Sequence, residues 1–173
     1  MMDVWFFIAL VIWVLASLVR NIYESRKYAG SGPSERGGAL HIVMSAMFLM
    51  WFSWFFMAFA DPVKLTISTW QRYVGLAVFS VGVILFVVSE TTKGGVSDTG
   101  SLVTKGIYSK IRHPMYLGQI MMAVGFPIYA RGLVTLCLSA VWVAQILYWR
   151  HLEEKDLIGR FEEYGEYRKR TWF

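Results

Sequence analysis

Residues 37–60 read GGALHIVMSAMFLMWFSWFFMAFA, a stretch without a single Asp, Glu, Lys or Arg. About 20 consecutive apolar residues in a helix are enough to cross the hydrocarbon core of a bilayer. Polar and apolar residues do not alternate here, and lipid tolerates only helices or closed barrels, so the stretch predicts a membrane-spanning helix. The pair Asp61-Pro62 follows, and proline ends a helix because its nitrogen cannot donate a hydrogen bond.

Four further uncharged runs cover residues 4–19, 73–89, 114–130 and 132–149. The chain of 173 residues is 56% hydrophobic and only 17% charged, which is not the composition of a soluble globular protein. The first run follows Asp3 rather than a positive leader, and more runs come after it, so we interpret it as a span and not as a signal peptide. We predict an all-α integral membrane protein with five transmembrane helices and a cytosolic C-terminal helix.

The connections between these runs are too short for a separate soluble catalytic domain, so we predict a single membrane domain over residues 1–173. Ala130-Arg131-Gly132 leaves room only for a tight turn, so the fourth and fifth spans should form an antiparallel helical hairpin. No span contains a Gly-x-x-x-Gly pair, so the sequence specifies no oligomer.

The net charge of +5 is distributed unevenly between the two sides of these spans. Of the 17 Lys and Arg residues, 14 lie in the first and third connections and in the tail, whereas Lys64, Arg72 and Arg131 lie in the other connections. Positive residues accumulate in connections that stay in the cytosol. The asymmetry predicts an N-terminus outside and a C-terminal tail in the cytosol. The basic charge therefore reports topology, and we expect no nucleic-acid partner.

A metal site has little support in the sequence. The single Cys137 lies in the fifth run, which excludes an intrachain disulfide and gives no basis for a cysteine-based metal site. His41, His113 and His151 are far apart and lack a ligand spacing such as His-x-x-x-His. We expect no bound metal.

The third connection, residues 91–113, is long and rich in Gly, Ser, Thr and aromatic and basic residues. Loops of this length are often functional. Pro114 follows it and suits the first turn of a helix, where a missing backbone donor costs nothing. Two interpretations suit the polar and aromatic residues around this proline: a ligand site, or a belt of interfacial side chains before a membrane helix. These residues are Tyr108, Arg112, His113 and Tyr116. The connection alone leaves both interpretations open.

The tail after the fifth run carries an amphipathic pattern. Apolar residues and charged residues each recur at intervals of three and four between residues 150 and 167, which predicts a helix continuing out of the fifth span. Arg150 and Glu154 are one turn apart and can pair. Six basic and six acidic residues lie between Arg150 and Arg170, which is unlike a polybasic lipid-binding tail.

The third connection, the start of the fourth run and the tail together carry four motifs. These are Ser97-Asp98-Thr99-Gly100-Ser101-Leu102-Val103-Thr104-x-Gly106-x-Tyr108, Arg112-His113-Pro114-x-Tyr116-x-Gly118, Arg150-x-x-x-Glu154 and the tail residues Phe161, Tyr164 and Tyr167. Taken together, these motifs resemble the isoprenylcysteine carboxyl methyltransferase family, part of a wider group of membrane methyltransferases that includes phospholipid N-methyltransferases. The resemblance covers about residues 93–170. On this basis we expect residues 1–89 to be a three-span scaffold and residues 90–173 to hold a cofactor-binding loop, a helical hairpin and an amphipathic tail.

The resemblance implies S-adenosylmethionine as the cofactor. It implies catalytic roles for Arg150 and Glu154, with Arg150 contacting the substrate. Two of the implied cofactor positions depart from the family, because Lys93 replaces a usual Gln and Gly100 a common His. The tail Thr171-Trp172-Phe173 also lacks the customary proline-containing ending. The implied cofactor contacts are Lys93, Gly100, Ser101, Leu102, Val103, Tyr108, His113, Pro114, Met115, Tyr116 and Glu154.

The charges of this cofactor agree with the implied residues. Its sulfonium and ammonium need carboxylates and aromatic faces, such as Glu154, Tyr108 and Tyr116, and its carboxylate needs donors such as His113. All of these residues fall on the predicted cytosolic side, and we expect the active site there, together with membrane lipids and a lipidic or prenylated substrate as partners.

The nature of the methyl acceptor is harder to predict. A prenylcysteine carboxylate is already ionised and needs orientation by an arginine, for which Arg150 is suited. A phospholipid amine must first lose a proton, to Glu153 or Glu154, and a small thiol is a further alternative. We favour the carboxylate. Two other classes stay open: a membrane sterol reductase, which binds a nicotinamide cofactor and usually has about twice as many spans, and a non-enzymatic membrane scaffold.

Overall fold

The computed structural model describes residues 4–28, 38–93 and 101–173, with Ala39 and Leu40 described by their backbone only. These ranges fold into helices without a β-strand, and two isolated bridges join Lys64 to Gly132 and Ile111 to Trp172. The elements are α1 (Val4–Tyr28), α2 (Gly38–Ala60), α3 (Thr69–Lys93), the short 3-10 helix η1 (Gly106–Ser109), α4 (Pro114–Ala130), α5 (Leu133–Arg160) and α6 (Tyr164–Arg170).

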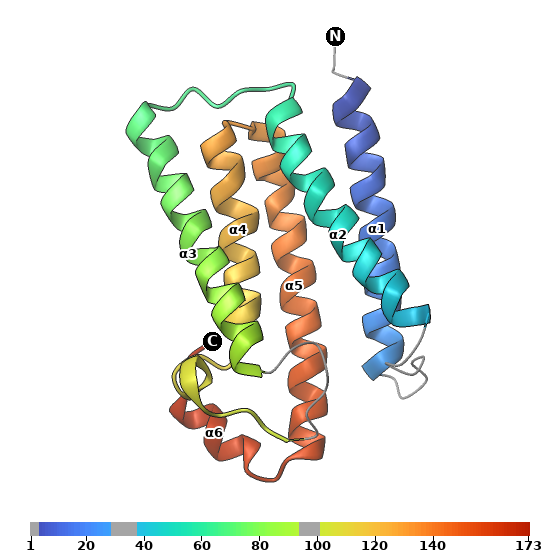
Figure 1. The fold of residues 1–173 in the computed structure, drawn as a ribbon, viewed down its shortest axis with the longest axis vertical. Helices are drawn as coiled ribbons and strands as arrows, with labels where there is room; N and C mark the ends of the chain where they lie inside the picture. Colours follow the sequence, from blue (N-terminus) through green and yellow to red (C-terminus); the bar gives the residue numbers. More distant parts are fainter. Residues whose placement is uncertain (1–3, 29–37, 94–100) are drawn as a thin grey trace.

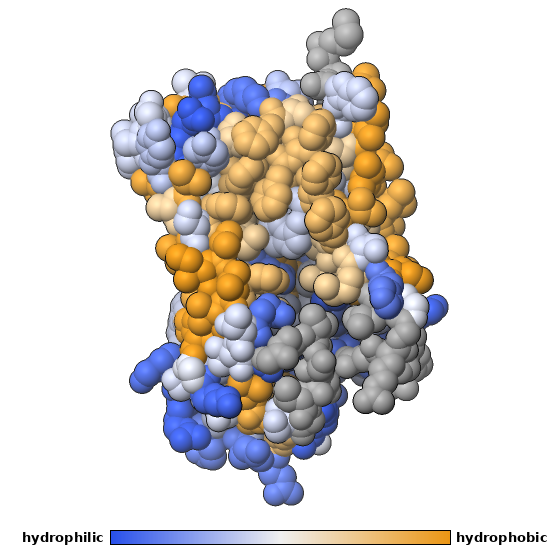
Figure 2. All heavy atoms as spheres, viewed as in Figure 1, coloured by the Kyte–Doolittle hydropathy of each residue, from blue (hydrophilic) through white to orange (hydrophobic). Residues whose placement is uncertain are grey.

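The helices α1 to α5 run alternately in opposite directions and form a bundle, with the start of α1 at one end and α6 at the other (Figure 1). The prediction of an all-helical membrane protein is confirmed at this level. Within the described ranges, four helices are long and apolar enough to cross a membrane, namely α1, α2, α3 and α5, whereas α4 has 17 residues. Figure 2 shows apolar surface over the middle of one face of the bundle and polar surface at both ends, as lipid contact requires.

Glycines bring the backbones of α3 and α4 into close contact. A Cβ added at Gly118 would lie 2.6 Å from the carbonyl oxygen of Gly82, and one added at Gly125 would lie 2.7 Å from that of Gly75. Gly75 and Gly82 are seven residues apart on α3, and Gly118 and Gly125 are seven residues apart on α4. Each pair therefore lies on one face of its helix. The close approach fixes the start of α4 beside the end of α3, where the site lies.

Tryptophans fill the interior between α1, α2 and α5. The rings of Trp51 and Trp142 lie 4.3 Å apart, Trp54 and Trp142 4.6 Å, and Trp13 and Trp54 5.3 Å. The indole nitrogen of Trp54 donates to the carbonyl of Ala123 at 3.2 Å, which ties α2 to α4. This aromatic core holds α1 against the helices that carry the predicted motifs.

A buried carboxylate joins α2 to the hairpin at the end of the bundle away from α6. Asp61 accepts hydrogen bonds from the backbone nitrogen and the hydroxyl of Thr135, each at 2.7 Å, and so caps the start of α5. The predicted end of α2 before Asp61-Pro62 and the tight turn between α4 and α5 are both confirmed. Arg131 occupies this turn with a φ of 64°, so the hairpin depends on a left-handed residue.

The tail differs from the continuous helix that its periodicity predicts. The helix α5 ends at Arg160, Phe161 is extended, and α6 begins at Tyr164. This break allows Tyr164 and Tyr167 to become buried, whereas a straight continuation would carry them away from the bundle. The apolar residues keep the same three- and four-residue spacing on both sides of the break. The periodicity of the sequence therefore did not reveal the break.

Candidate active site

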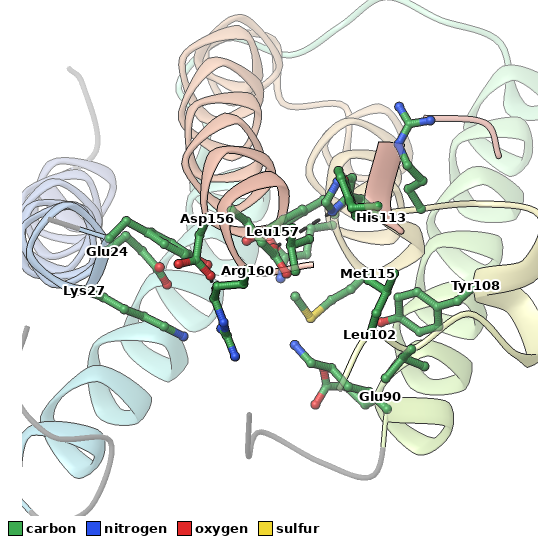
Figure 3. Close-up of a pocket in the computed structure, with 18 of the residues that line it drawn as sticks. Glu24, Lys27, Glu90, Leu102, Tyr108, His113, Met115, Asp156, Leu157 and Arg160 are labelled. Carbon is green, nitrogen blue, oxygen red and sulfur yellow. Dashed lines mark hydrogen bonds and ion pairs between the residues drawn. The ribbon is translucent and has the colours of Figure 1, made fainter. Parts of the chain in front are cut away.

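A cavity of about 560 Å³ lies at the α6 end of the bundle, and all five long helices contribute to its wall. This volume is within the range of small-molecule sites in proteins. Figure 3 shows side chains from α1, α3, α5 and the segment before α4 around this space. The cavity brings together eight of the residues that the resemblance assigns to the cofactor: Lys93, Ser101, Leu102, Val103, Tyr108, His113, Met115 and Tyr116.

The remaining assigned residues have other positions. Pro114 is the buried first residue of α4, as its predicted role at the helix start requires. Glu154 and Arg150 are not among the described residues that line the cavity. Gly100 lies outside the described residues.

Tyr108 reaches the cavity from η1, which α6 holds in place. The hydroxyl of Tyr167 donates to the backbone carbonyl of Tyr108 at 2.6 Å. Gly106 opens η1 with a φ of 60°, which favours glycine, and a Cβ there would lie 3.0 Å from the Thr92 methyl group at the end of α3. Burial raises the pKa of Tyr108, so this side chain stays protonated at neutral pH and can donate a hydrogen bond.

Glu154 is the point where three cationic or potentially cationic side chains meet. Its Oε1 lies 3.3 Å from Nε2 of His113, 3.4 Å from Nε of Arg112 and 3.3 Å from a guanidinium nitrogen of Arg150. The Glu154 side chain is only 13% exposed. The predicted Arg150–Glu154 pair is present. The Glu154 carboxylate does not line the cavity itself but holds His113, which does.

The last residues hold Arg112 and cover Arg150. A guanidinium nitrogen of Arg112 donates to the carbonyls of Arg168 and Thr171 at 3.0 and 2.7 Å. The ring of Phe173 lies 4.5 Å from the guanidinium carbon of Arg150, a cation–π contact. Contact between Arg150 and a substrate stays a prediction.

Sequence reasoning missed the contribution of α1. Glu24 is 3% exposed, lines the cavity and pairs with Arg20 one turn away. Arg20 also lies over the ring of Trp149, at 5.4 Å. The signal was present, because Arg20-x-x-x-Glu24 repeats the spacing of Arg150-x-x-x-Glu154 at the same end of the bundle. The other cavity acids missing from the sequence prediction are Glu90 and Asp156.

A family model described as phospholipid methyltransferase matches residues 70–164, more than half of the chain. The chain belongs to the phospholipid methyltransferase family. The match runs from α3 to the first residue of α6, and family membership implies a methyl donor. The walls that α1 and α2 contribute lie outside the matched segment.

Individual relatives fall in two groups. The chain is 34% identical over 120 residues to human protein-S-isoprenylcysteine O-methyltransferase and 31% identical over 119 residues to the Xenopus laevis protein of that name. Each alignment covers 60% of this chain and 40% of the relative. Methanethiol S-methyltransferase of Pseudomonas deceptionensis is 29% identical over 152 residues, 76% of this chain and 54% of the relative.

The chain thus spans about two fifths to one half of the length of these relatives. No solved structure matches it. The described residues contain no group of three metal-binding side chains.

Proposed function

We propose that the chain is a membrane methyltransferase that uses S-adenosylmethionine and methylates the carboxylate of an isoprenylcysteine-like lipidic acceptor at the cytosolic membrane face. The observation that carries the proposal is the single cavity in which eight residues implied for the cofactor meet, at one end of an apolar helical bundle. These residues come from α3, the segment before α4, and α4 itself, which are separate in sequence. If these residues only formed an aromatic and basic belt at the membrane interface, they would not be expected to converge on one cavity.

The cavity has the chemistry that this cofactor needs. Glu90 and Glu153 line it and would face the positive sulfonium and ammonium groups, with the ring of Tyr116 nearby. Lys93 offers a cation to the cofactor carboxylate. The Tyr164 hydroxyl is buried and has no hydrogen-bond partner among the described residues, which suits a site that a polar ligand completes.

When bound, S-adenosylmethionine supplies a methyl group on positively charged sulfur, which an acceptor oxygen takes by displacement as the sulfur–methyl bond breaks. The chain itself would orient the acceptor and exclude water, and the acceptor carboxylate needs no base because it is already ionised. We propose that Glu154 acts by holding His113 and Arg112 in the wall. Its contacts with the guanidinium groups of Arg112 and Arg150 make it a poor proton acceptor.

Two features favour a lipidic acceptor on the cytosolic side. Val43, Met44 and Met47 of α2 give the cavity an apolar wall next to its charged groups, as an amphiphilic molecule requires. The uneven distribution of Lys and Arg supports five spans, with α4 as the fourth, and a cytosolic cavity.

A small thiol is the second candidate acceptor. The methanethiol S-methyltransferase relative aligns with 76% of this chain, against 60% for the isoprenylcysteine enzymes. Glu153, which lines the cavity and lies 4.0 Å from Nδ1 of His113, would then take the thiol proton.

The proposal is tested on detergent-purified protein by calorimetric titration with S-adenosylhomocysteine and with NADPH. We expect binding of the first compound only. A radiolabelled methyl-transfer assay against S-farnesylcysteine, phosphatidylethanolamine and methanethiol then identifies the acceptor. Binding of NADPH instead of S-adenosylhomocysteine would contradict the proposal.

A further inference from the structure

Four charged residues of the cavity wall have no role in the cofactor site described above. Glu24 and Lys27 from α1, with Asp156 and Arg160 from α5, form this α1–α5 wall. In Figure 3 the amine of Lys27 and the guanidinium of Arg160 extend toward the open space, on the side away from Leu102 and Tyr108.

The carboxylates of the α1–α5 wall are engaged with arginines. Asp156 Oδ2 lies 3.1 Å from a guanidinium nitrogen of Arg160, and Glu24 pairs with Arg20. The charged lining residues of α1 and α5 balance, because Glu153 of α5 also lines the cavity. Over the whole described lining, five Lys or Arg side chains face four acidic side chains, so the cavity has a small net positive charge. The cationic groups of Lys27 and Arg160 are the ones that reach into the cavity.

The charge of the proposed cofactor adds to this effect. The cofactor has two positive groups and one negative group, so a filled cofactor site makes the cavity more positive and favours an anionic acceptor. Arg150, the arginine that the sequence implies for this role, lies under Phe173 and is not among the described residues that line the cavity.

We propose that Lys27 and Arg160 recognise the anionic head group of the methyl acceptor. One oxygen of a carboxylate would contact this pair, and the other oxygen would stay directed at the methyl group. The inference rests on the proposed function and deepens it. It assigns acceptor recognition to α1, which lies outside the segment that the family model matches, and to the last turn of α5.

The test compares binding of N-acetyl-S-farnesylcysteine and of its neutral carboxamide to the full-length protein in detergent. The variants are Lys27→Gln and Arg160→Gln. The matched controls are Arg26→Gln on α1 and Lys155→Gln on α5, which remove the same charge from exposed positions outside the cavity lining. Each variant is also titrated with S-adenosylhomocysteine, and its thermal unfolding is recorded.

We expect the parent protein to prefer the acid. Each of the two cavity variants should bind the acid roughly fivefold more weakly, because a partly exposed charge contact contributes about 1 kcal/mol. Binding of the carboxamide and of S-adenosylhomocysteine should not change, and the two controls should keep the preference of the parent.

Three results would overturn the inference. The first is equal binding of acid and carboxamide by the parent protein. The second is an unchanged preference in both cavity variants. The third is weaker binding of S-adenosylhomocysteine rather than of the acid, which would assign the two cations to the cofactor carboxylate. A further result separates this inference from the proposed function. If the parent prefers the acid and both variants lose that preference, but the parent does not bind S-adenosylhomocysteine, the anion site is supported and the proposed function is rejected.

Discussion

Glu154 joins His113, Arg112 and Arg150 through a single carboxylate oxygen, and that oxygen is the polar centre behind the cavity. Glu154→Gln should weaken S-adenosylhomocysteine binding by about tenfold or more, because a neutral amide leaves the partly buried guanidinium groups of Arg112 and Arg150 without compensation. The melting temperature should also fall. Calorimetric titration and thermal unfolding measure the two effects.

The matched control for this change is Glu166→Gln. Glu166 pairs with Lys169 on α6 while its side chain is 71% exposed, so an exposed pair of this kind contributes little. Normal cofactor affinity in Glu154→Gln would show that the site does not depend on this carboxylate.

Arg150 gives a second prediction at the level of single residues. In the structure it contacts Glu154 and Phe173, so its role would be to position Glu154. Arg150→Lys keeps a charge for Glu154 and should retain most of the methyl-transfer rate, whereas Arg150→Ala should lose it. A direct two-pronged contact with an acceptor carboxylate predicts instead that lysine is nearly as poor as alanine. The kcat and KM of the two variants, measured separately, distinguish these roles.

Among the elements, α3 and α4 depend on glycine to approach each other. Gly118→Ala should destabilise the protein by about 1–3 kcal/mol, because its new Cβ would collide with the backbone of Gly82. It should also weaken cofactor binding, since the start of α4 carries Met115 and Tyr116.

Gly159→Ala is the control for this change. Nothing lies within 4 Å of a Cβ at Gly159, and the residue is near the end of α5, so alanine should be neutral or stabilise by up to about 1 kcal/mol. Thermal unfolding of both variants in one detergent gives the comparison. Equal stability of Gly118→Ala and the parent would contradict close packing of α3 on α4.

These glycines show what the sequence could and could not predict about the fold. The uncharged runs identified the hydrophobic parts of all five long helices. Asp61-Pro62 identified the end of α2, and residues 130–132 identified the turn between α4 and α5. A search for Gly-x-x-x-Gly missed the α3–α4 contact because its glycines are seven residues apart. Periodicity predicted an amphipathic tail but not its break at Phe161, because the same spacing serves a straight or a folded tail.

The short helix α6 gives a prediction about pH. Burial raises the pKa of Tyr164 and of Tyr167 to about 12, above the usual value near 10. The protonated form is therefore favoured by folding, so its contribution to stability is complete below about pH 10 and is lost as the pH rises toward 12. Thermal unfolding between pH 9 and 12 should show this loss.

Tyr167→Phe should reduce that pH dependence, although it also removes the hydrogen bond to Tyr108 and so lowers stability at neutral pH. Tyr73→Phe, at an exposed position on α3, is a control that should change neither. A pH profile of Tyr167→Phe identical to that of the parent would mean that α6 does not make this contribution.

For the whole molecule, the site forms where helices extend beyond their apolar runs. α1 continues to Tyr28, α3 to Lys93 and α5 to Arg160, and these charged extensions supply much of the cavity wall. The sequence indicated the part of the site after residue 90 because its motifs resemble a known family. For α1 the sequence offered only the Arg20-x-x-x-Glu24 spacing, which does not tell which helix faces the cavity, since that depends on packing of Trp13 and Trp54 in the distant core.

The orientation of the whole chain gives the final prediction. Ser68 lies exposed between α2 and α3, and Glu162 lies exposed between α5 and α6. In a Cys137→Ala background, Ser68→Cys should react with a membrane-impermeant maleimide added outside intact cells, because its connection carries few basic residues. Glu162→Cys should react only after permeabilisation, and so should Lys105→Cys in the segment before α4.

The same three positions decide whether α4 crosses the membrane. The bridge between Lys64 and Gly132 places the α4–α5 turn beside the connection that contains Ser68. α4 therefore has to lead from the side of Lys105 to the side of Ser68, and its 17 residues cover about 25 Å, close to the thickness of a bilayer core. Labelling of Lys105→Cys and Ser68→Cys from the same side would reject both the fifth span and a cytosolic cavity, because α3 and α4 would then fail to separate these positions.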